Sequence, residues 1–277
     1  MVWEPKSPAI IHAPAEALDR YGNPRIGGGC PSPHRMMMAA SAAGGGAYTP
    51  DAAVFDGTTQ QLDRGADFDG NVDGKEGICS FWVNFNGENG IAAEFWYASG
   101  GYVSLARLAY GSHINKMYVQ IYGAGGLRLD GTTVLTDATG WHHVYYSWNV
   151  ATPAGWLWVD GADDLSASTV TDGTLDYTRA DHTFMGNNSP SADVADFYLN
   201  LATSLDPGDS NNILKFRDGD GNAVDLGSDG SIPTGSQPIA FHHLDDGQAA
   251  VNFGTNLGSG GGMNITGTLT STDGPNG

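Results

Sequence analysis

The chain has 277 residues, among them 41 Gly and 13 Pro, and only 16% of its residues are charged. Its 12 basic and 31 acidic residues give a net charge of −19, the wrong sign for a groove that follows nucleic-acid phosphates or a surface that docks on anionic lipid. No segment has the roughly 18 consecutive apolar residues of a membrane-spanning helix. The composition favours a turn-rich, all-β protein.

Residues 1–47 differ from the rest of the chain. They contain scattered prolines, two Gly-Gly-Gly runs and no hydrophobic period of 2 or 3.6 residues. Such a segment buries too little apolar surface to fold alone, so we expect an extended arm. It lacks the basic region and apolar core of a secretory signal peptide. Cys30 in this arm and Cys79 further on have no C-x-x-C spacing, and we expect both to be free thiols.

Short strands separated by Gly-rich turns are predicted from Tyr48 to about residue 200. Within residues 78–85, Cys79, Phe81, Val83 and Phe85 alternate with a more polar set, so we expect them to face the core. Near the end of this region, Ala195, Phe197 and Leu199 are expected to share one face of a strand. Other strands are expected within residues 54–62 and 182–186, with two more within residues 90–111 around Ser-Gly-Gly and a further pair within residues 116–137.

The stretch richest in aromatic residues is 140–161, and it predicts a β-hairpin. Residues 141–148 and 156–159 are dominated by rings and Val, and the Ala-Thr-Pro-Ala-Gly between them is turn chemistry. Alternation places His142, Val144, Tyr146 and Trp148 on one face and Trp141, His143, Tyr145 and Ser147 on the other. Both faces carry rings, so we expect this hairpin to be covered on both sides.

This hairpin also carries a resemblance to a known family. W-H-H-V at 141–144 followed by L-W-V-D-G at 157–161 resembles the laminin-G-like branch of the concanavalin A-like jelly rolls. Segments 54–65, 77–87 and 184–200 fit the same pattern in order. The resemblance implies an all-β jelly-roll sandwich over residues 48–205, flanked by extended N- and C-terminal arms.

Residues 206–277 are expected to form a short helix and a hairpin or strand extension that packs on the sandwich. Asp206 is suited to the N-cap of this helix and Pro207 to its first position. N-A-V-D-L-G at 222–227 and F-G-T-N-L-G at 253–258 resemble the C-terminal extension of laminin-G-like proteins of tailed bacteriophages.

The phage resemblance implies a virion structural protein, either a capsid decoration or head fibre, or a tail or baseplate fibre component. Residues 1–47 would anchor it to other virion proteins, as a homo-oligomer. The lectin-like sandwich would face outward and adhere to host or environmental glycans. The alternative is a free carbohydrate-binding lectin or glycoside hydrolase of a bacterium. A third reading is an interaction module without a glycan role.

Catalytic motifs are scarce in the sequence, so we expect a protein that is not an enzyme. Glycosidases need two carboxylates at a set separation, and the predicted strand that carries Glu94 has no second carboxylate two residues on. The sequence contains no G-x-S-x-G elbow and no G-x-x-x-x-G-K-[ST] phosphate loop.

Two acidic loops are weak calcium candidates, and no other cofactor is expected. Asp218, Asp220 and Asn222 place oxygen ligands at alternate positions, as in the first half of an EF-hand loop, but the downstream Glu is missing. Gly-rich hairpin turns explain the same residues. A second oxygen-rich loop contains Asp67, Asp69 and Asp73.

Two histidine pairs and several aromatic residues complete the candidates. Adjacent strand residues point to opposite faces, so neither His142–His143 nor His242–His243 is expected to chelate one zinc ion, and packed, hydrogen-bonded histidines are expected instead. Exposed aromatic residues are candidates for sugar stacking or subunit contacts, with contacts the preferred reading. They are Trp82, Trp96, Tyr97, Trp141, Trp156 and Trp158.

Overall fold

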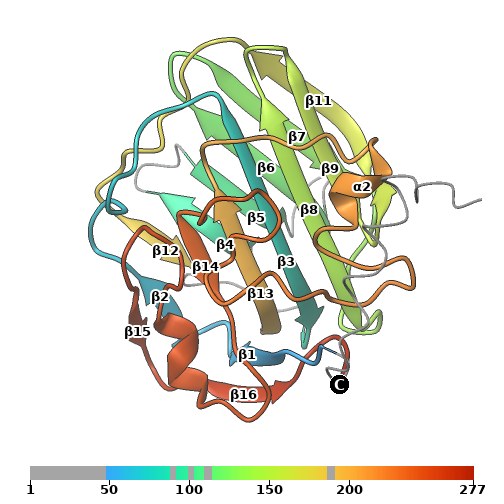
Figure 1. Cartoon of the computed structure of the whole chain (residues 1–277), viewed down its shortest axis with the longest axis vertical. Coiled ribbons are helices and arrows are strands. Elements are labelled where there is room, and N and C mark those ends of the chain that lie inside the picture. The colour runs from blue at the N-terminus through green and yellow to red at the C-terminus, as the bar shows by residue number, and fades with distance from the viewer. Residues whose placement is uncertain (1–47, 88–91, 99–102, 109–113, 186–190) are drawn as a thin grey trace, which may run out of the picture. The chain divides into compact units, whose positions relative to one another are not determined.

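A computed structural model describes residues 48–277 except 88–91, 99–102, 109–113 and 186–190. The described part of the chain forms two antiparallel β-sheets packed face to face (Figure 1), which confirms the all-β sandwich. The expected arm at residues 1–47, with Cys30, lies outside the described residues. None of the described helices is long and apolar enough to cross a membrane.

Sheet 1 contains the predicted hairpin and two strands from the C-terminal region, β14 (Ala240–His242) and β16 (Thr270–Asp273). Its strand order is β10 (Ala162–Asp163), β9 (Ala154–Val159), β8 (Trp141–Asn149), β3 (Glu76–Phe85), β13 (Ala192–Asn200), β1 (Asp51–Phe55) and β16, and β14 pairs with β13 beside this path.

Sheet 2 forms the other layer of the sandwich. Its strand order is β11 (Leu165–Thr171), β7 (Gly126–Gly131), β6 (Lys116–Tyr122), β5 (Val103–Leu108), β4 (Ala92–Ala98), β12 (His182–Phe184), β2 (Gln61–Asp63) and β15 (Asn264–Thr266). Residues 162–183, which are polar, thus supply the edge strand β11 beside β7.

The ring-rich hairpin is covered on both faces, as expected. Val144, Tyr146 and Trp148 of β8 lie in the core between the sheets, and Trp148 Nε1 donates a hydrogen bond of 2.7 Å to the Tyr177 hydroxyl. Tyr145 packs on the outer side of sheet 1, in a second cluster. In β3, the neighbour of β8, the predicted set Cys79, Phe81, Val83 and Phe85 faces the core.

The expectation for β13 is wrong at one residue. Phe197 and Leu199 face the core, but Ala195 lies on the outer side of sheet 1. A bulge interrupts the pairing of β13 with β3 between Ala195 and Tyr198, and Asp196 within it has a φ of 49°. The extra residue shifts the alternation by one position. Even-numbered residues therefore face the core before the bulge, and odd-numbered residues face it after the bulge.

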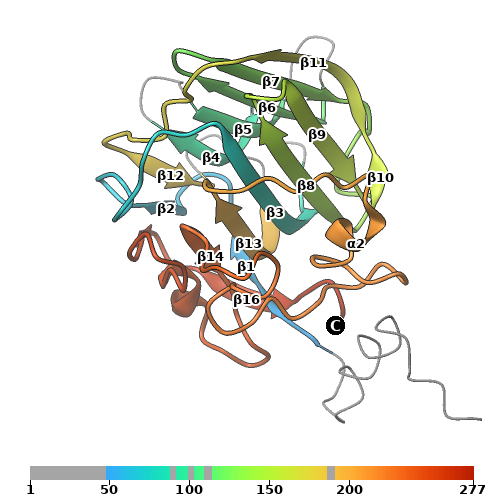
Figure 2. The ribbon, with the colours of Figure 1, turned by 45° about the horizontal axis from the view of Figure 1, so that its top comes forward.

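The C-terminal region is woven into both sheets. It supplies β14 and β16 to sheet 1 and β15 to sheet 2, and the red segments in Figures 1 and 2 accordingly lie along one end of the sandwich. Its loops also cover the outer face of sheet 1, where Phe216, Leu226 and Phe241 pack with Tyr145 and Tyr198.

The helix of this region begins later than expected. Helix α2 spans Ser210–Ile213 and its N-cap is Asp209, whose side chain accepts a hydrogen bond from the backbone N–H of Asn211. Asp206 instead accepts from the N–H of Gly208 and forms a turn. Pro207 therefore precedes the helix. A short 3-10 helix, η3 (Ala250–Gly254), follows β14.

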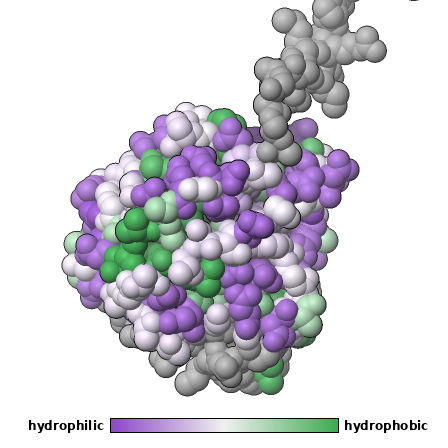
Figure 3. All heavy atoms as spheres, turned by 90° about the horizontal axis from the view of Figure 1, so that it is seen from below, coloured by the Kyte–Doolittle hydropathy of each residue, from purple (hydrophilic) through white to green (hydrophobic). Residues whose placement is uncertain are grey.

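The end of the sandwich near β15, β16 and η3 exposes a mixed surface. Figure 3 shows that hydrophilic residues dominate this face and surround one larger hydrophobic cluster. Val251 of η3 is 63% exposed. An exposed apolar side chain such as Val251 is by itself common on protein surfaces.

Candidate functional site

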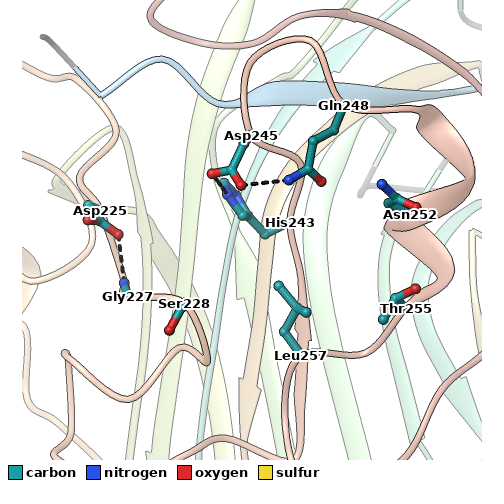
Figure 4. Close-up of a pocket in the computed structure, with 9 residues that line it drawn as sticks. All are labelled: Asp225, Gly227, Ser228, His243, Asp245, Gln248, Asn252, Thr255 and Leu257. Carbon is teal, nitrogen blue, oxygen red and sulfur yellow. Dashed lines mark hydrogen bonds and ion pairs between the residues drawn. The ribbon is translucent and has the colours of Figure 1, made fainter.

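A pocket of about 500 Å³ opens between two segments of the C-terminal region. In Figure 4, Asp225, Gly227 and Ser228 lie on one side and Asn252 and Thr255 on the other, with His243 and Asp245 between them. We call this the His243 pocket. It is lined by Asp225, Gly227, Ser228, His243, Asp245, Gln248, Asn252, Thr255 and Leu257.

The floor of the pocket is a histidine held between two carboxylates. His243 directly follows β14, and it is 8% exposed. Its Nδ1 lies 2.7 Å from Asp196 Oδ1, and its Nε2 lies 2.9 Å from Asp245 Oδ1. Burial alone would lower the pKa of His243, but hydrogen bonds and charge from Asp196 and Asp245 outweigh burial and raise it to about 9. The ring is therefore an imidazolium at neutral pH, with both N–H groups engaged.

The bulge in β13 explains why Asp196 reaches this histidine. Before the bulge β13 pairs with β1, and after it β13 pairs with β14, which ends one residue before His243. Asp196 also accepts hydrogen bonds from the Tyr48 hydroxyl at 2.9 and 3.0 Å. Burial and the Asp196 charge raise the pKa of Tyr48, so the phenol remains a donor. A bulge that redirects one side chain is typical of functional sites.

Aromatic rings support the imidazole. The Tyr48 ring is nearly parallel to it, with centroids 6.0 Å apart and an interplanar angle of 18°. The Phe241 ring is also stacked on it, at 5.6 Å and 5°. A ring held by two stacking contacts and two carboxylates has little freedom to rotate, so the pocket floor is preorganised.

The walls of the pocket are polar and rich in hydrogen-bond acceptors. Gln248 Nε2 donates to Asp245 Oδ2 at 2.6 Å, and the backbone N–H of Gly227 donates to Asp225 Oδ1 at 2.7 Å. The carboxylates, the Gln248 carbonyl, the Asn252 amide and the hydroxyls of Ser228 and Thr255 remain to meet a ligand. Such a pocket can bind a polyhydroxylated molecule.

Two segments that build this pocket carry motifs visible in the sequence, but the pocket side chains were not among the predicted site residues. The two tail motifs at 222–227 and 253–258 meet here, since Asp225 and Gly227 come from one and Thr255 and Leu257 from the other. In the sequence, His243 stands out only as one member of the adjacent pair His242–His243. Nothing in the sequence indicated Asp245 or Gln248, because their partners are distant in the chain.

The histidines of the two pairs are packed, and each one forms hydrogen bonds with partners of its own, as predicted. His242 Nδ1 bonds the Phe253 carbonyl inside the core, and burial lowers the pKa of His242 to about 4. His143 bonds the Ser80 hydroxyl at 2.9 Å, and burial lowers its pKa to about 3. His142 bonds Asp160 instead.

The expected exposure of the aromatic candidates is wrong for two of the six. Trp96 is 0% exposed in the core, where its Nε1 donates to His182, and Trp82 is 4% exposed beneath Trp141 and Tyr48. The other four are partly buried. Trp158 packs against the cluster of Tyr145, because the C-terminal loops cover the outer face of sheet 1. None of the six lines the His243 pocket.

The calcium candidates lie in hydrogen-bonded turns. Asp218 Oδ1 accepts from the backbone N–H groups of Asp220 and Asn222, and its Oδ2 accepts from Asn222 Nδ2. Although burial opposes it, this hydrogen bonding lowers the pKa of Asp218. Asp67 accepts a hydrogen bond from Asn71 in its own loop, Asp73 accepts one from the backbone N–H of Tyr177, and Asp69 pairs with Arg64. Over the described ranges, no group of three or more His, Cys, Asp or Glu side chains is placed to hold a metal.

A second hollow, of about 280 Å³, lies on the outer face of sheet 2. Tyr122, which is 47% exposed, lies at its edge with Gln120, Arg128, Thr169 and Thr171. Arg128 pairs with Asp130 at 3.1 Å and lies over the Tyr118 ring, 5.5 Å from its centroid. This hollow shares no residue with the His243 pocket.

Similarity to known proteins is found among solved structures. No family model matches the sequence, and no curated protein matches it. Among solved structures, the fold is similar to a candidate carbohydrate-binding protein from Bacteroides ovatus, with a TM-score of 0.57 and 14% identity over 82% of this chain and 61% of that one. The fold is a laminin-G-like, concanavalin A-like jelly roll.

Two further solved structures show weaker similarity. A heptameric SAP-like pentraxin from Limulus polyphemus has a TM-score of 0.44 and 10% identity, over 59% of this chain and 81% of that one. Domains LG4-5 of the mouse laminin alpha1 chain have a TM-score of 0.40 and 14% identity, over 59% and 45% of the two chains. This chain spans 61% of the Bacteroides ovatus protein.

Proposed function

We propose that this jelly roll is a carbohydrate-binding domain and that the His243 pocket holds the sugar. The observation that supports the pocket is its construction, with carboxylate, amide and hydroxyl groups converging from two walls over an ion-paired floor. Sugars carry many hydroxyls, and fixed polar groups around a cavity provide orientation and specificity. The Bacteroides ovatus protein of similar fold, a candidate carbohydrate-binding protein, supports the ligand class.

The first test is a glycan array probed with the full chain, followed by titration calorimetry with each hit. Asp245→Asn alters the pocket, whereas Asp246→Asn changes the neighbouring exposed carboxylate, which does not line it. We expect the first variant to weaken binding by about tenfold or more and the second to leave it unchanged.

The hollow on the outer face of sheet 2 is the competing location for the sugar site. Binding that survives Asp245→Asn but is lost in Tyr122→Ala would move the sugar site to that face. An array without any hit, using correctly folded protein, would refute carbohydrate binding altogether. Both results can be interpreted because circular dichroism and thermal unfolding report folding separately.

We further propose that the domain is displayed on a phage particle, as a decoration or fibre protein without catalytic activity. The support is the sequence resemblance at 222–227 and 253–258. In this proposal, residues 1–47 are the segment that attaches the domain to the particle. A mass-spectrometric inventory of purified particles that contains this chain would support it. The alternative is a free lectin or glycoside hydrolase of a bacterium. Detection of this chain in a bacterial culture free of phage particles would favour a free protein, and cleavage of the bound array glycans would favour a hydrolase.

A further inference from the structure

We infer that the His243 pocket selects saccharides that carry a positively charged amino group and rejects those that carry a carboxylate. This inference deepens the proposed function and rests on it. It follows from two properties of the pocket lining, its charge and the kind of hydrogen-bonding group that it leaves for a ligand.

The charge of the lining is negative. Asp225 and Asp245 contribute carboxylates, and the nine lining residues include no Lys or Arg. The cation in the floor, His243, gives one N–H to Asp196 and the other to Asp245. The His243 charge is therefore balanced by buried Asp196, and the carboxylates of Asp225 and Asp245 remain in excess.

The hydrogen-bonding groups of the lining have the matching polarity. The Gln248 amide N–H group and the Gly227 N–H group already donate to Asp245 and Asp225. These contacts hold the carboxylates in place, and each carboxylate keeps further lone pairs for a donor. An ammonium group has three donors and no acceptor, so it satisfies this lining, whereas a ligand carboxylate would face acceptors and like charge.

The uncharged polar groups of the lining explain why the ligand is a sugar amine and not a bare cation. Ser228, Asn252 and Thr255 carry groups that both donate and accept, and they lie around the same cavity as the two carboxylates. A volume of about 500 Å³ is of the size that ligand pockets have. A saccharide can thus place an amino group at a carboxylate of the lining and its hydroxyls at these three uncharged side chains.

The test is calorimetry at pH 6 with the full chain and three short oligosaccharides of equal length. These are oligomers of glucosamine, N-acetylglucosamine and a uronic acid. We expect the glucosamine oligomer to bind about tenfold tighter than the acetylated one, and the uronic acid oligomer not to bind. Because Asp225 and Asp245 are exposed, the preference is expected to shrink as salt is raised.

Two variants separate pocket recognition from general attraction to an acidic protein. Asp225→Asn removes one carboxylate from the lining and is expected to abolish most of the preference, while Asp246→Asn removes an equal charge outside it and is expected to preserve it. A preference that survives Asp225→Asn, or that both variants reduce equally, overturns the inference.

The failure of this inference is distinguishable from that of the proposed function. If the acetylated or uronic acid oligomer binds as well as the glucosamine oligomer, and Asp245→Asn abolishes that binding, the sugar site stands and its charge preference is wrong. If none of the three oligomers and no array glycan binds, the proposed function falls with the inference.

Discussion

Asp196 and His243 form a buried ion pair, with Oδ1 and Nδ1 2.7 Å apart, although 47 positions separate them in the chain. Asp196 is 3% exposed, and its backbone adopts a left-handed conformation within the bulge. Because β13 changes its neighbour from β1 to β14 at this bulge, the pair also marks the junction between the sandwich and its C-terminal extension.

The pH dependence of stability is expected to carry the signature of His243. Its folded pKa of about 9 lies above the ordinary value of 6.5, so its stabilisation is complete below pH 6.5 and is lost as pH rises through 9. The loss is on the order of 3 kcal/mol. Urea unfolding from pH 6 to 10 measures it. Subtracting a His243→Gln series isolates the contribution, and equal slopes for both proteins would contradict it.

Asp196→Asn is expected to destabilise the domain at pH 7 by about 3 kcal/mol, because it leaves the buried imidazolium without its main counter-charge. Asn tolerates positive φ, so backbone strain does not confound the comparison. Asp245→Asn is the matched variant. Its carboxylate is 68% exposed, and we expect a loss below about 1 kcal/mol. Chemical unfolding measures both, and equal losses would show that burial does not set the strength of these contacts.

Gly77→Ala is expected to destabilise the sandwich by about 3 kcal/mol, since a Cβ at this position would overlap the indole ring of Trp148. Trp148 is 0% exposed and bonded to Tyr177, so it has no room to move. Gly126→Ala in β7 is the control, because no atom lies within 4 Å of the added Cβ. Thermal unfolding distinguishes them, and a neutral Gly77→Ala would contradict the packing described for β8.

Tyr177→Phe is expected to cost about 2 kcal/mol while leaving the fold intact. The Tyr177 hydroxyl accepts from Trp148 Nε1 at 2.7 Å and donates to the Glu76 carbonyl at 3.0 Å. Its removal strands a buried donor and a buried acceptor without changing the volume of the ring. Denaturant unfolding gives the loss. A variant as stable as the parent would mean that water satisfies both groups.

Features that depend on neighbouring residues were predictable from the sequence. Period-two alternation identified β3 and its core face, and aromatic composition with turn residues identified the β8–β9 hairpin. The rings on both faces of β8 correctly predicted cover on both sides. The sequence predicted Asp206 as the helix N-cap, whereas the N-cap is Asp209. Both Asp side chains accept a hydrogen bond from a backbone N–H two residues on, so local sequence does not distinguish a turn from a helix start.

The six aromatic candidates show the limit of local patterns. Composition indicated that rings were too many for one core, but not that this chain's own C-terminal loops would cover Trp82 and pack against Trp158. The same limit applies at Ala195. A bulge leaves no periodic signal, because its cause is a change of strand partner.

The sequence by itself determined the all-β class, the central hairpin with cover on both faces and the core-facing side chains of β3, because those features repeat over two to ten residues. Only the tertiary structure decided that Asp196, His243 and Asp245 form one charged network and that the tail motifs at 222–227 and 253–258 face one cavity. Those contacts join distant segments whose register is fixed by the pairing of β14 with β13, and no local pattern encodes such pairing.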